Sequence, residues 1–244
     1  MRWIYLSPHL DDAVLSAGGL IYDQVQSGIP VEIWTILAGY PLEGELSQFA
    51  QLQHYMWGFP SAEAAIRARR QEDQNAAAVL GAKTVHFDFL DCIYRRGSSG
   101  EWLFDDITVP PHAEDSSRPG QMAEAILARL QPDDILVCQL AVGSHVDHVL
   151  VRQGAEKTGL PLLYDIDLPY FLSKPEELEP KSTGMRKSVH SVTDSGLSAW
   201  HRAVVEYKSQ LPLFGEYMYT PEKVRESLAT YRDRWGGVPI LQFG

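Results

Sequence analysis

The feature that most constrains the fold of this chain is an alternation of short apolar runs with longer segments of helical periodicity. Five apolar runs have the length of buried strands, at residues 3–7, 31–38, 84–87, 135–140 and 162–165. Five further segments have helical patterns, at residues 12–27, 62–80, 121–130, 148–158 and 197–208. Because strands that alternate with helices form a parallel sheet covered on both faces, the sequence predicts an α/β, doubly wound fold.

Length and composition fit a single folded domain spanning residues 1–244. Hydrophobic residues make up 45% of the chain, which is enough to bury a sizeable core. Three segments without regular periodicity are expected to be long loops, at residues 39–60, 95–120 and 173–196. Loops of this length in a compact domain are commonly lids or binding segments. No linker or internal repeat divides the chain.

Charge, hydropathy and cysteine content argue against nucleic-acid-binding, membrane-spanning, secreted and disulfide-rich proteins. The formal net charge is −11, which argues against a nucleic-acid partner because such proteins present basic surfaces to phosphates. No apolar run is long enough to span a membrane, and the first residues lack the pattern of a signal peptide. The two cysteines, Cys92 and Cys138, make neither a disulfide framework nor a thiolate zinc site. We therefore expect a cytoplasmic protein.

The first apolar run ends in a concentration of side chains that can bind a metal. The stretch S-P-H-L-D-D places His9, Asp11 and Asp12 where the strand ends and the next helix begins. In open α/β sheets, ligands bind outside the carboxyl ends of the strands, so a site is expected here. An aspartate at a helix start is also a good N-cap, and this stretch alone leaves the two interpretations evenly balanced.

The fourth apolar run is followed by a second concentration of such side chains. The stretch G-S-H-V-D-H brings His145, Asp147 and His148 to the start of another helix, with the two histidines three residues apart. Imidazole and carboxylate ligands suit Zn²⁺, and three protein ligands with an open position are typical of a catalytic zinc site. Since no thiolate is present, Fe²⁺, Mn²⁺ and Co²⁺ remain alternatives.

Together these motifs resemble the LmbE-like superfamily, also called the N-acetylglucosaminyl-phosphatidylinositol de-N-acetylase (PIG-L) family. P-H-L-D-D is similar to the family signature (A/P)-H-P-D-D-E, and H-V-D-H is similar to H-P-D-H. The segments R-A-R-R-Q-E-D-Q-N-A-A-A-V-L-G, residues 67–81, and E-Y-K-S-Q, residues 206–210, look like further family patterns. The resemblance implies a Rossmann-like, three-layer fold with a mostly parallel central sheet, and an enzyme of the zinc-dependent deacetylase class.

The resemblance also implies a metal site and a general base. His9, Asp12 and His148 would hold the zinc, and Asp11 would accept a proton from the attacking water. The reaction implied is hydrolysis of the N-acetyl group of an N-acetylglucosamine-type conjugate, a small-molecule substrate. Members of the family often assemble, so a homo-oligomer is expected on resemblance alone.

The resemblance also implies roles for residues of the second motif and of the arginine-rich helix. His145 would stabilise the oxyanion or protonate the leaving amine, with Asp147 as its orienting partner. Arg69 matches the family arginine that contacts substrate, although Arg70 beside it is an alternative.

The chain departs from the family pattern at three positions. Leu10 and Val146 replace prolines and alter mainly the stiffness of the turns. Ala13 replaces the usual glutamate, so a carboxylate behind the metal ligands is expected to be missing. The metal and base positions themselves are intact.

Loop residues offer weaker candidates for substrate recognition. Arg95 and Arg96 either meet an anionic group or are simply solvated. Several aromatic side chains either stack on a sugar or pack within the loops: Tyr40, Phe49, Tyr55, Trp57 and Trp102.

Three other functions compete with sugar deacetylation. A Rossmann enzyme that binds a nucleotide or a methyl donor is disfavoured because the first turn lacks G-x-G-x-x-G, and Gly18 and Gly19 fall inside a helix instead. A metal-stabilised scaffold protein would be expected to have lost the base or a ligand. A zinc amidase that acts on another acyl group or on a non-sugar amide stays open.

Overall fold

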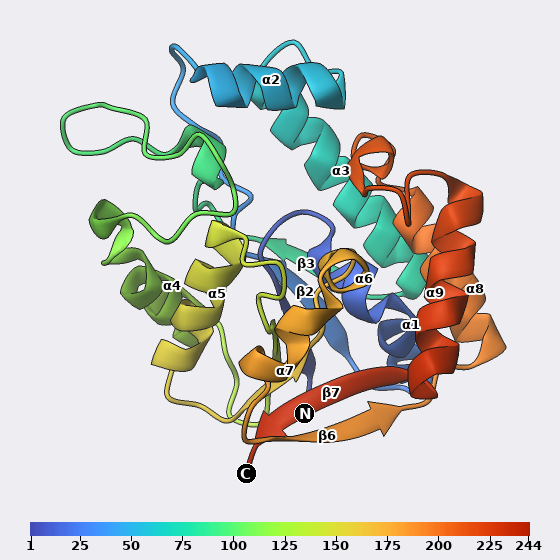
Figure 1. The fold of residues 1–244 in the computed structure, drawn as a ribbon. Coiled ribbons are helices and arrows are strands. Elements are labelled where there is room, and N and C mark those ends of the chain that lie inside the picture. Colours follow the sequence, from blue (N-terminus) through green and yellow to red (C-terminus); the bar gives the residue numbers. More distant parts are fainter.

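The computed structural model describes all 244 residues and contains one seven-stranded sheet. The strands follow the order β3-β2-β1-β4-β5-β7-β6 (Figure 1). Their bounds are β1 Trp3–Ser7, β2 Val31–Thr35, β3 Lys83–His86, β4 Ile135–Gln139, β5 Leu162–Asp165, β6 Met185–His190 and β7 Val238–Phe243. β1 to β5 are parallel, whereas β7 runs antiparallel to both β5 and β6. The predicted mostly parallel sheet is confirmed.

Helices cover both faces of this sheet (Figure 1). One layer contains α1 Asp12–Gln26, α3 Ala62–Leu80, α8 Asp194–Val205 and α9 Pro221–Trp235, and the other contains α4 Arg118–Leu127 and α5 Val146–Lys157. The remaining helices are α2 Gln48–Trp57, α6 Tyr170–Ser173 and α7 Leu178–Lys181, with 3₁₀ turns at Cys92–Tyr94, Ala113–Asp115, Pro175–Glu177 and Leu211–Leu213. The arrangement is the predicted three-layer α/β fold.

Local sequence signals explain where α3 begins and ends. The hydroxyl of Ser61 accepts a hydrogen bond from the N–H of Ala64, which caps the start of the helix. Gly81 ends the helix with a φ of 77°, a conformation that residues with a Cβ rarely adopt. The observed helix therefore has the bounds that the sequence predicts.

The glycine pair in α1 allows close packing against α8. A Cβ atom on Gly18 would lie 2.4 Å from Cδ1 of Trp200. Trp200 is fully buried, and its indole N–H donates to the carbonyl of Val14 at 2.7 Å. The glycines therefore make room for an indole ring and have no part in a nucleotide-binding turn.

The position of β1 at the centre of the sheet determines where a ligand can bind. β1 pairs with β2 on one side and β4 on the other, so the chain connections diverge from this strand. In doubly wound sheets, such a switch point opens a crevice at the carboxyl ends of the strands. The turns that follow β1 and β4 meet at this crevice.

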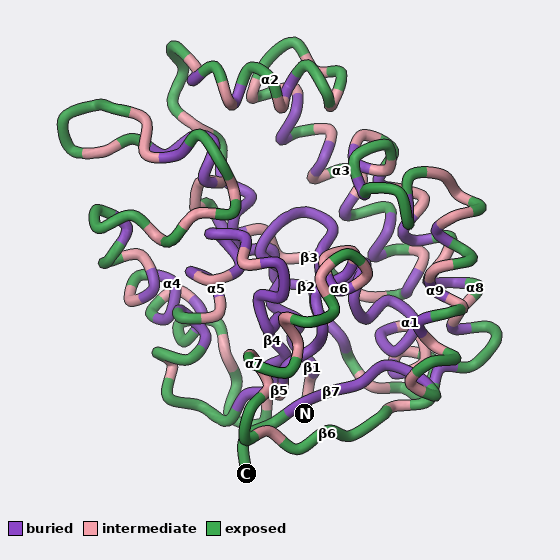
Figure 2. Tube along the Cα trace, in the orientation of Figure 1, coloured by how far each residue is buried: buried purple, intermediate pink, exposed green.

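Besides the one-turn helices, the sequence patterns do not indicate α2, α9, β6 and β7. β6 is an edge strand with mostly exposed residues (Figure 2), so it lacks the apolar run of a buried strand. It lies within the segment expected to be a loop at residues 173–196. No helix combines the length and the apolar character needed to cross a bilayer.

Candidate active site

The turn that follows β1 presents its polar side chains from a buried position. The Ser7 hydroxyl donates to the carbonyl of His9 at 2.6 Å and accepts from the N–H of Ala13 at 3.0 Å. Asp12, the first residue of α1, accepts from the N–H of His9 at 2.7 Å. Asp11 precedes the helix but makes no side-chain capping hydrogen bond. Helix capping therefore does not account for Asp11.

The turn that follows β4 brings two more histidines against the first turn. The ring centroid of His9 lies 4.8 Å from that of His145 and 5.3 Å from that of His148. All three rings are buried. The two motifs therefore form one site, as the parallel arrangement of β1 and β4 predicts.

His9, Asp12 and His148 have the spacing that one metal ion requires. Nδ1 of His9 lies 3.3 Å from Oδ2 of Asp12, and Nε2 of His148 lies 3.4 Å from Oδ1 of Asp12. Ligand atoms around a tetrahedral zinc with bonds of about 2.0–2.1 Å lie about 3.3 Å apart. Nε2 of His148 is buried without a hydrogen-bond partner, which fits a nitrogen that faces a metal. The residues present therefore fit a divalent metal.

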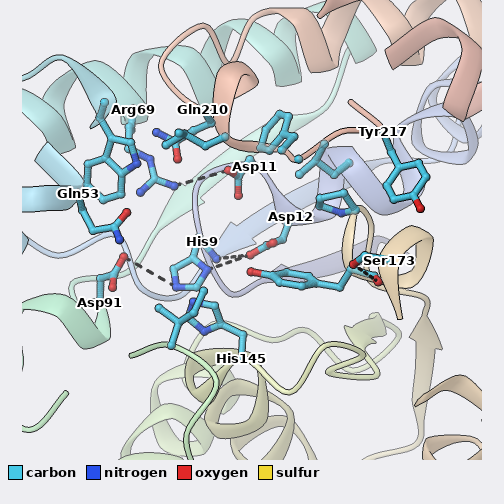
Figure 3. Close-up of a pocket in the computed structure, with 18 of the residues that line it drawn as sticks. His9, Asp11, Asp12, Gln53, Arg69, Asp91, His145, Ser173, Gln210 and Tyr217 are labelled. Atoms are coloured by element: carbon cyan, nitrogen blue, oxygen red, sulfur yellow. Dashed lines mark hydrogen bonds and ion pairs between the residues drawn. The ribbon is translucent and has the colours of Figure 1, made fainter. Parts of the chain in front are cut away.

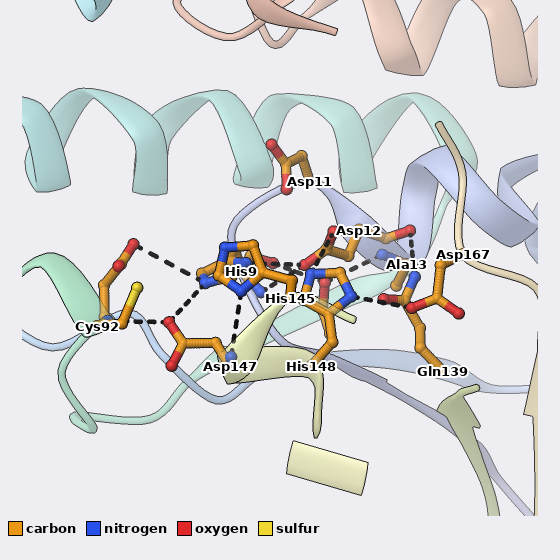
Figure 4. A network of polar contacts seen from close by, with 12 residues as sticks. His9, Asp11, Asp12, Ala13, Cys92, Gln139, His145, Asp147, His148 and Asp167 are labelled. Atoms are coloured by element: carbon orange, nitrogen blue, oxygen red, sulfur yellow. Dashed lines mark hydrogen bonds and ion pairs between the residues drawn. The ribbon is translucent and has the colours of Figure 1, made fainter. Parts of the chain in front are cut away.

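A carboxylate holds each of these histidines from behind (Figure 4). Nδ1 of His148 lies 2.9 Å from Oδ1 of Asp167, and Nε2 of His9 lies 3.0 Å from Oδ2 of Asp147. Such partners fix the tautomer and the orientation of a metal-binding imidazole. Ala13 leaves no carboxylate at its own position, but Asp147 and Asp167 supply this support from elsewhere.

The carboxylate of Asp147 faces His9, not the ring of His145. It also accepts from the backbone N–H of Cys92 at 2.9 Å and from Nη1 of Arg95 at 2.5 Å. The hydrogen bond between Asp147 and His145 is made by the backbone N–H of Asp147, not by its carboxylate. Burial alone would raise the pKa of Asp147, but Arg95 and His9 hold it well below its usual range. The structure thus differs from the expectation that this side chain orients His145.

Asp11 and Asp12 have opposite pKa shifts although they are adjacent. Burial, followed by the charge of Asp12, raises the pKa of Asp11 to about 7, against the opposing effect of Arg69. Nη2 of Arg69 lies 3.6 Å from Oδ2 of Asp11. Burial would also raise the pKa of Asp12, but His148 and His9 bring it below its usual range. Such a pair suits one ionised ligand and one proton acceptor.

His145 is arranged as a neutral hydrogen-bond donor. Burial, followed by repulsion from His9 and His148, lowers the pKa of His145 well below its usual value. Its Nδ1 accepts the N–H of Asp147 at 3.1 Å, so the proton of the neutral ring is on Nε2. From this position the ring can donate a hydrogen bond into the cavity that it lines.

A cavity of about 400 Å³ is lined by five of these residues (Figure 3): His9, Asp11, Asp12, Arg69 and His145. The guanidinium of Arg69 lies over the ring of Trp57, 4.7 Å from its centroid. Further aromatic and polar side chains complete the wall: Tyr170, Phe214, Tyr217, Gln53, Asp91 and Gln210. A cavity of this size with convergent polar groups is typical of a small-molecule site.

The arginines considered from the sequence have distinct environments. Arg69 lines the cavity, whereas Arg70 points away from it and donates to the carbonyl of Ala38. Arg95 is fully buried, so it is neither solvated nor open to an external anion. Arg96 donates to loop carbonyls and does not line the cavity.

Of the aromatic candidates, Trp57 alone lines the cavity. Tyr40 lies under the guanidinium of Arg70, and Trp102 lies under that of Arg96. Tyr40 therefore packs against α3, and Trp102 packs within its own loop.

Comparison with known proteins agrees with this geometry. A family model for the GlcNAc-PI de-N-acetylases (PIG-L) matches residues 4–158, which is more than half of the chain and includes both metal motifs. The chain belongs to this family.

Relatives of this PIG-L family member include several deacetylases. The 2'-N-acetylparomamine deacetylase of Niallia circulans is 25% identical over 239 residues, covering 88% of this chain and 82% of that protein. The crystal structure of the zinc-inhibited form of teicoplanin deacetylase Orf2 is 30% identical, with a TM-score of 0.83, and covers 99% of this chain and 97% of that chain. The A40926 pseudoaglycone deacetylase Dbv21 is 28% identical, with a TM-score of 0.77, and covers 99% and 96% of the two chains.

Sequence reasoning missed several residues of the site. Asp91 and Asp167 follow β3 and β5, so they lie at the same carboxyl edge as the two motifs. The rule that ligands bind at this edge, applied to every strand, finds them. Phe214 and Tyr217 come from the segment between α8 and α9, for which the sequence offers no comparable signal.

Proposed function

We propose that this PIG-L family member is a metal-dependent hydrolase that removes the N-acetyl group of an N-acetylglucosamine-type amino sugar conjugate. The observation that carries the proposal is the buried group of His9, Asp12 and His148, which lies beside Asp11 at one cavity. Similarity to enzymes named as deacetylases of N-acetylparomamine and teicoplanin supports the reaction and the amino sugar.

In this proposal His9, Asp12 and His148 hold the ion. The ion, when bound, supplies Lewis-acid polarisation at the reacting amide. The two imidazoles and the carboxylate suit zinc, and Fe²⁺, Mn²⁺ or Co²⁺ are tested beside it. Because a similar deacetylase has a zinc-inhibited form, activity is measured over a range of added zinc concentrations.

Asp11 is proposed as the general base. A carboxylate with a pKa raised toward neutrality accepts the proton of the attacking water better than an ordinary aspartate does. The same proton then goes to the nitrogen of the amide as its C–N bond breaks, which gives acetate and a free amine. Nε2–H of His145 donates a hydrogen bond to the oxygen on which negative charge develops.

Arg69 and Trp57 are proposed to bind the sugar. An aromatic face next to a fixed guanidinium offers an apolar surface for a sugar ring and donors for its hydroxyl groups. Arg69 lines the cavity and forms an ion pair with Asp11 at 3.6 Å, so its guanidinium has further donors for the hydroxyl groups of a sugar.

The proposal is tested by supplying the purified, metal-loaded protein with N-acetylglucosamine conjugates that carry different aglycones. Release of primary amine and of acetate in equal amounts is the expected result. Asp11→Asn should lower kcat by about 10²–10⁴-fold while the metal content stays normal. His148→Ala should lose metal and activity together.

Asp133→Asn is the matched control, because Asp133 is exposed at the opposite edge of the sheet, next to the start of β4. Its turnover should equal that of the unsubstituted protein. Near-normal turnover by metal-bound Asp11→Asn would contradict the role of Asp11. Activity on other N-acyl amides but on no N-acetyl sugar would contradict the substrate class.

A further inference from the structure

A chain of charged side chains runs from His9 toward the surface. Nε2 of His9 lies 3.0 Å from Oδ2 of Asp147, and Nη1 of Arg95 donates to the other oxygen of Asp147 at 2.5 Å. Nε of Arg95 lies 3.0 Å from Oδ2 of Asp115. Asp115 in turn pairs with Arg118 at the start of α4. The network thereby joins four segments that are distant in sequence, around residues 9, 95, 115–118 and 147.

The inner part of this chain is sealed from water. The side chains of Arg95, Asp115 and Asp147 are all 0% exposed. Arg95 also donates to the carbonyl of Leu90 and lies over the ring of Phe104, so its guanidinium is held on several sides. Buried ion networks add little net stability, because desolvation offsets their attraction. Stability alone is therefore a weak explanation for this arginine.

We propose that Arg95 is a positioning residue for metal binding, acting on His9 through Asp147. This inference rests on the metal site of the proposed function. Arg95 fixes one oxygen of Asp147, which leaves the other against Nε2 of His9. His9 is then held with Nδ1 toward Asp12, the side on which the metal is proposed to bind.

Arg95 also keeps Asp147 itself out of the ligand set. His9, His145 and Asp147 form a second group whose atoms are close enough to hold an ion. In the observed arrangement, one oxygen of Asp147 is engaged by Arg95 and the other by His9 and the N–H of Cys92. Without Arg95, Asp147 gains a free oxygen and the two groups compete for His9.

The test is the affinity of the full-length protein for Zn²⁺ alone, measured by competition with a chromogenic chelator. Arg95→Gln should bind Zn²⁺ about tenfold to 100-fold more weakly than the unsubstituted protein. Arg95→Lys, which keeps a cation beside Asp147, should recover much of this loss. In an Asp147→Asn background, Arg95→Gln should have no further effect, because the residue through which it acts is already changed.

Arg95→Gln leaves two buried carboxylates without their shared cation and lowers stability. The double variant Arg95→Met/Asp115→Asn removes one buried charge of each sign, so it is the variant expected to fold, and it should show the same loss of affinity. Arg2→Gln is the control: Arg2 pairs with Asp134 at the opposite edge of the sheet, so this variant should lose stability but bind Zn²⁺ normally.

The outcomes separate this inference from the function on which it rests. Zn²⁺ binding within about twofold of normal by the folded double variant would overturn the role of Arg95 and leave the metal site intact. If Arg95→Gln weakened Zn²⁺ binding as much in the Asp147→Asn background as it does alone, the path through Asp147 would be overturned. Failure of the unsubstituted protein to bind Zn²⁺ would overturn the metal site and this inference together.

Discussion

Replacement of Asp167 by asparagine tests how the ring of His148 is held for a metal. One oxygen of Asp167 lies 2.9 Å from Nδ1 of His148, and the other accepts the N–H of Val142 at 3.0 Å. Both oxygens are therefore used as acceptors. The asparagine side chain of the Asp167→Asn variant would have only one acceptor oxygen, with an NH₂ group in place of the other.

Neither orientation of the new amide reproduces the native pattern of hydrogen bonds. If its oxygen faces Val142, the NH₂ group donates to Nδ1 of His148 and moves the ring proton to Nε2, the nitrogen that faces the metal position. If its oxygen faces His148, the new NH₂ group faces the N–H of Val142, and two donors oppose each other there. Holding the ring of His148 in the tautomer that can bind a metal therefore costs about one hydrogen bond. That is about 1–3 kcal/mol, which corresponds to roughly a tenfold to 100-fold loss of metal affinity.

The assay is zinc affinity by chelator competition, with thermal unfolding measured in the presence of a chelator. Asp165→Asn is the matched control, since Asp165 is equally buried two residues away and does not contact His148. Asp167→Asn should weaken zinc binding and leave the metal-free unfolding temperature nearly unchanged, because without a metal the amide can still contact both the N–H of Val142 and Nδ1 of His148. Unchanged zinc affinity in Asp167→Asn would refute the reasoning.

Two further predictions concern stability. Gly18→Ala should lower the free energy of unfolding by about 1–3 kcal/mol because its Cβ would overlap Trp200. Gly120→Ala in α4, where a Cβ meets open space, should raise the free energy of unfolding by about 0.5–1 kcal/mol. Equal urea midpoints for the two variants would contradict the close packing at Gly18. The hydrogen bond from Arg2 lowers the pKa of Asp134, so this pair stabilises the fold above the unfolded pKa of Asp134 and loses its effect as pH falls through the folded value. Arg2→Gln should therefore be less stable by about 1–2 kcal/mol at pH 7 and less different at pH 3, and a difference that stays constant with pH would contradict this.

The meeting of the two motifs was predictable because parallel strands place their carboxyl ends at one edge. The runs that form β1 and β4 are apolar up to their last residue, so their ends are visible in the sequence, and the polar side chains after them mark the turns. What these patterns do not contain is which strands are neighbours. The contact between His9 and His148 depends on the direct pairing of β1 with β4.

The environments of single side chains were less predictable. Arg95 stands in a segment that resembles a surface loop, and its burial depends on Asp115 and Asp147, which come from other parts of the fold. The partner of the Asp147 carboxylate differs from the expectation for a similar reason, since the family resemblance implies His145 but the carboxylate faces His9. Neither pairing has a local sequence signal.

The most direct test of the central claim is to locate the bound metal by anomalous diffraction from crystals grown with stoichiometric Zn²⁺. The account predicts one ion about 2.0–2.2 Å from Nδ1 of His9, an oxygen of Asp12 and Nε2 of His148, with Asp11 outside the ligand set. An ion held instead by the second group of His9, His145 and Asp147 would contradict it.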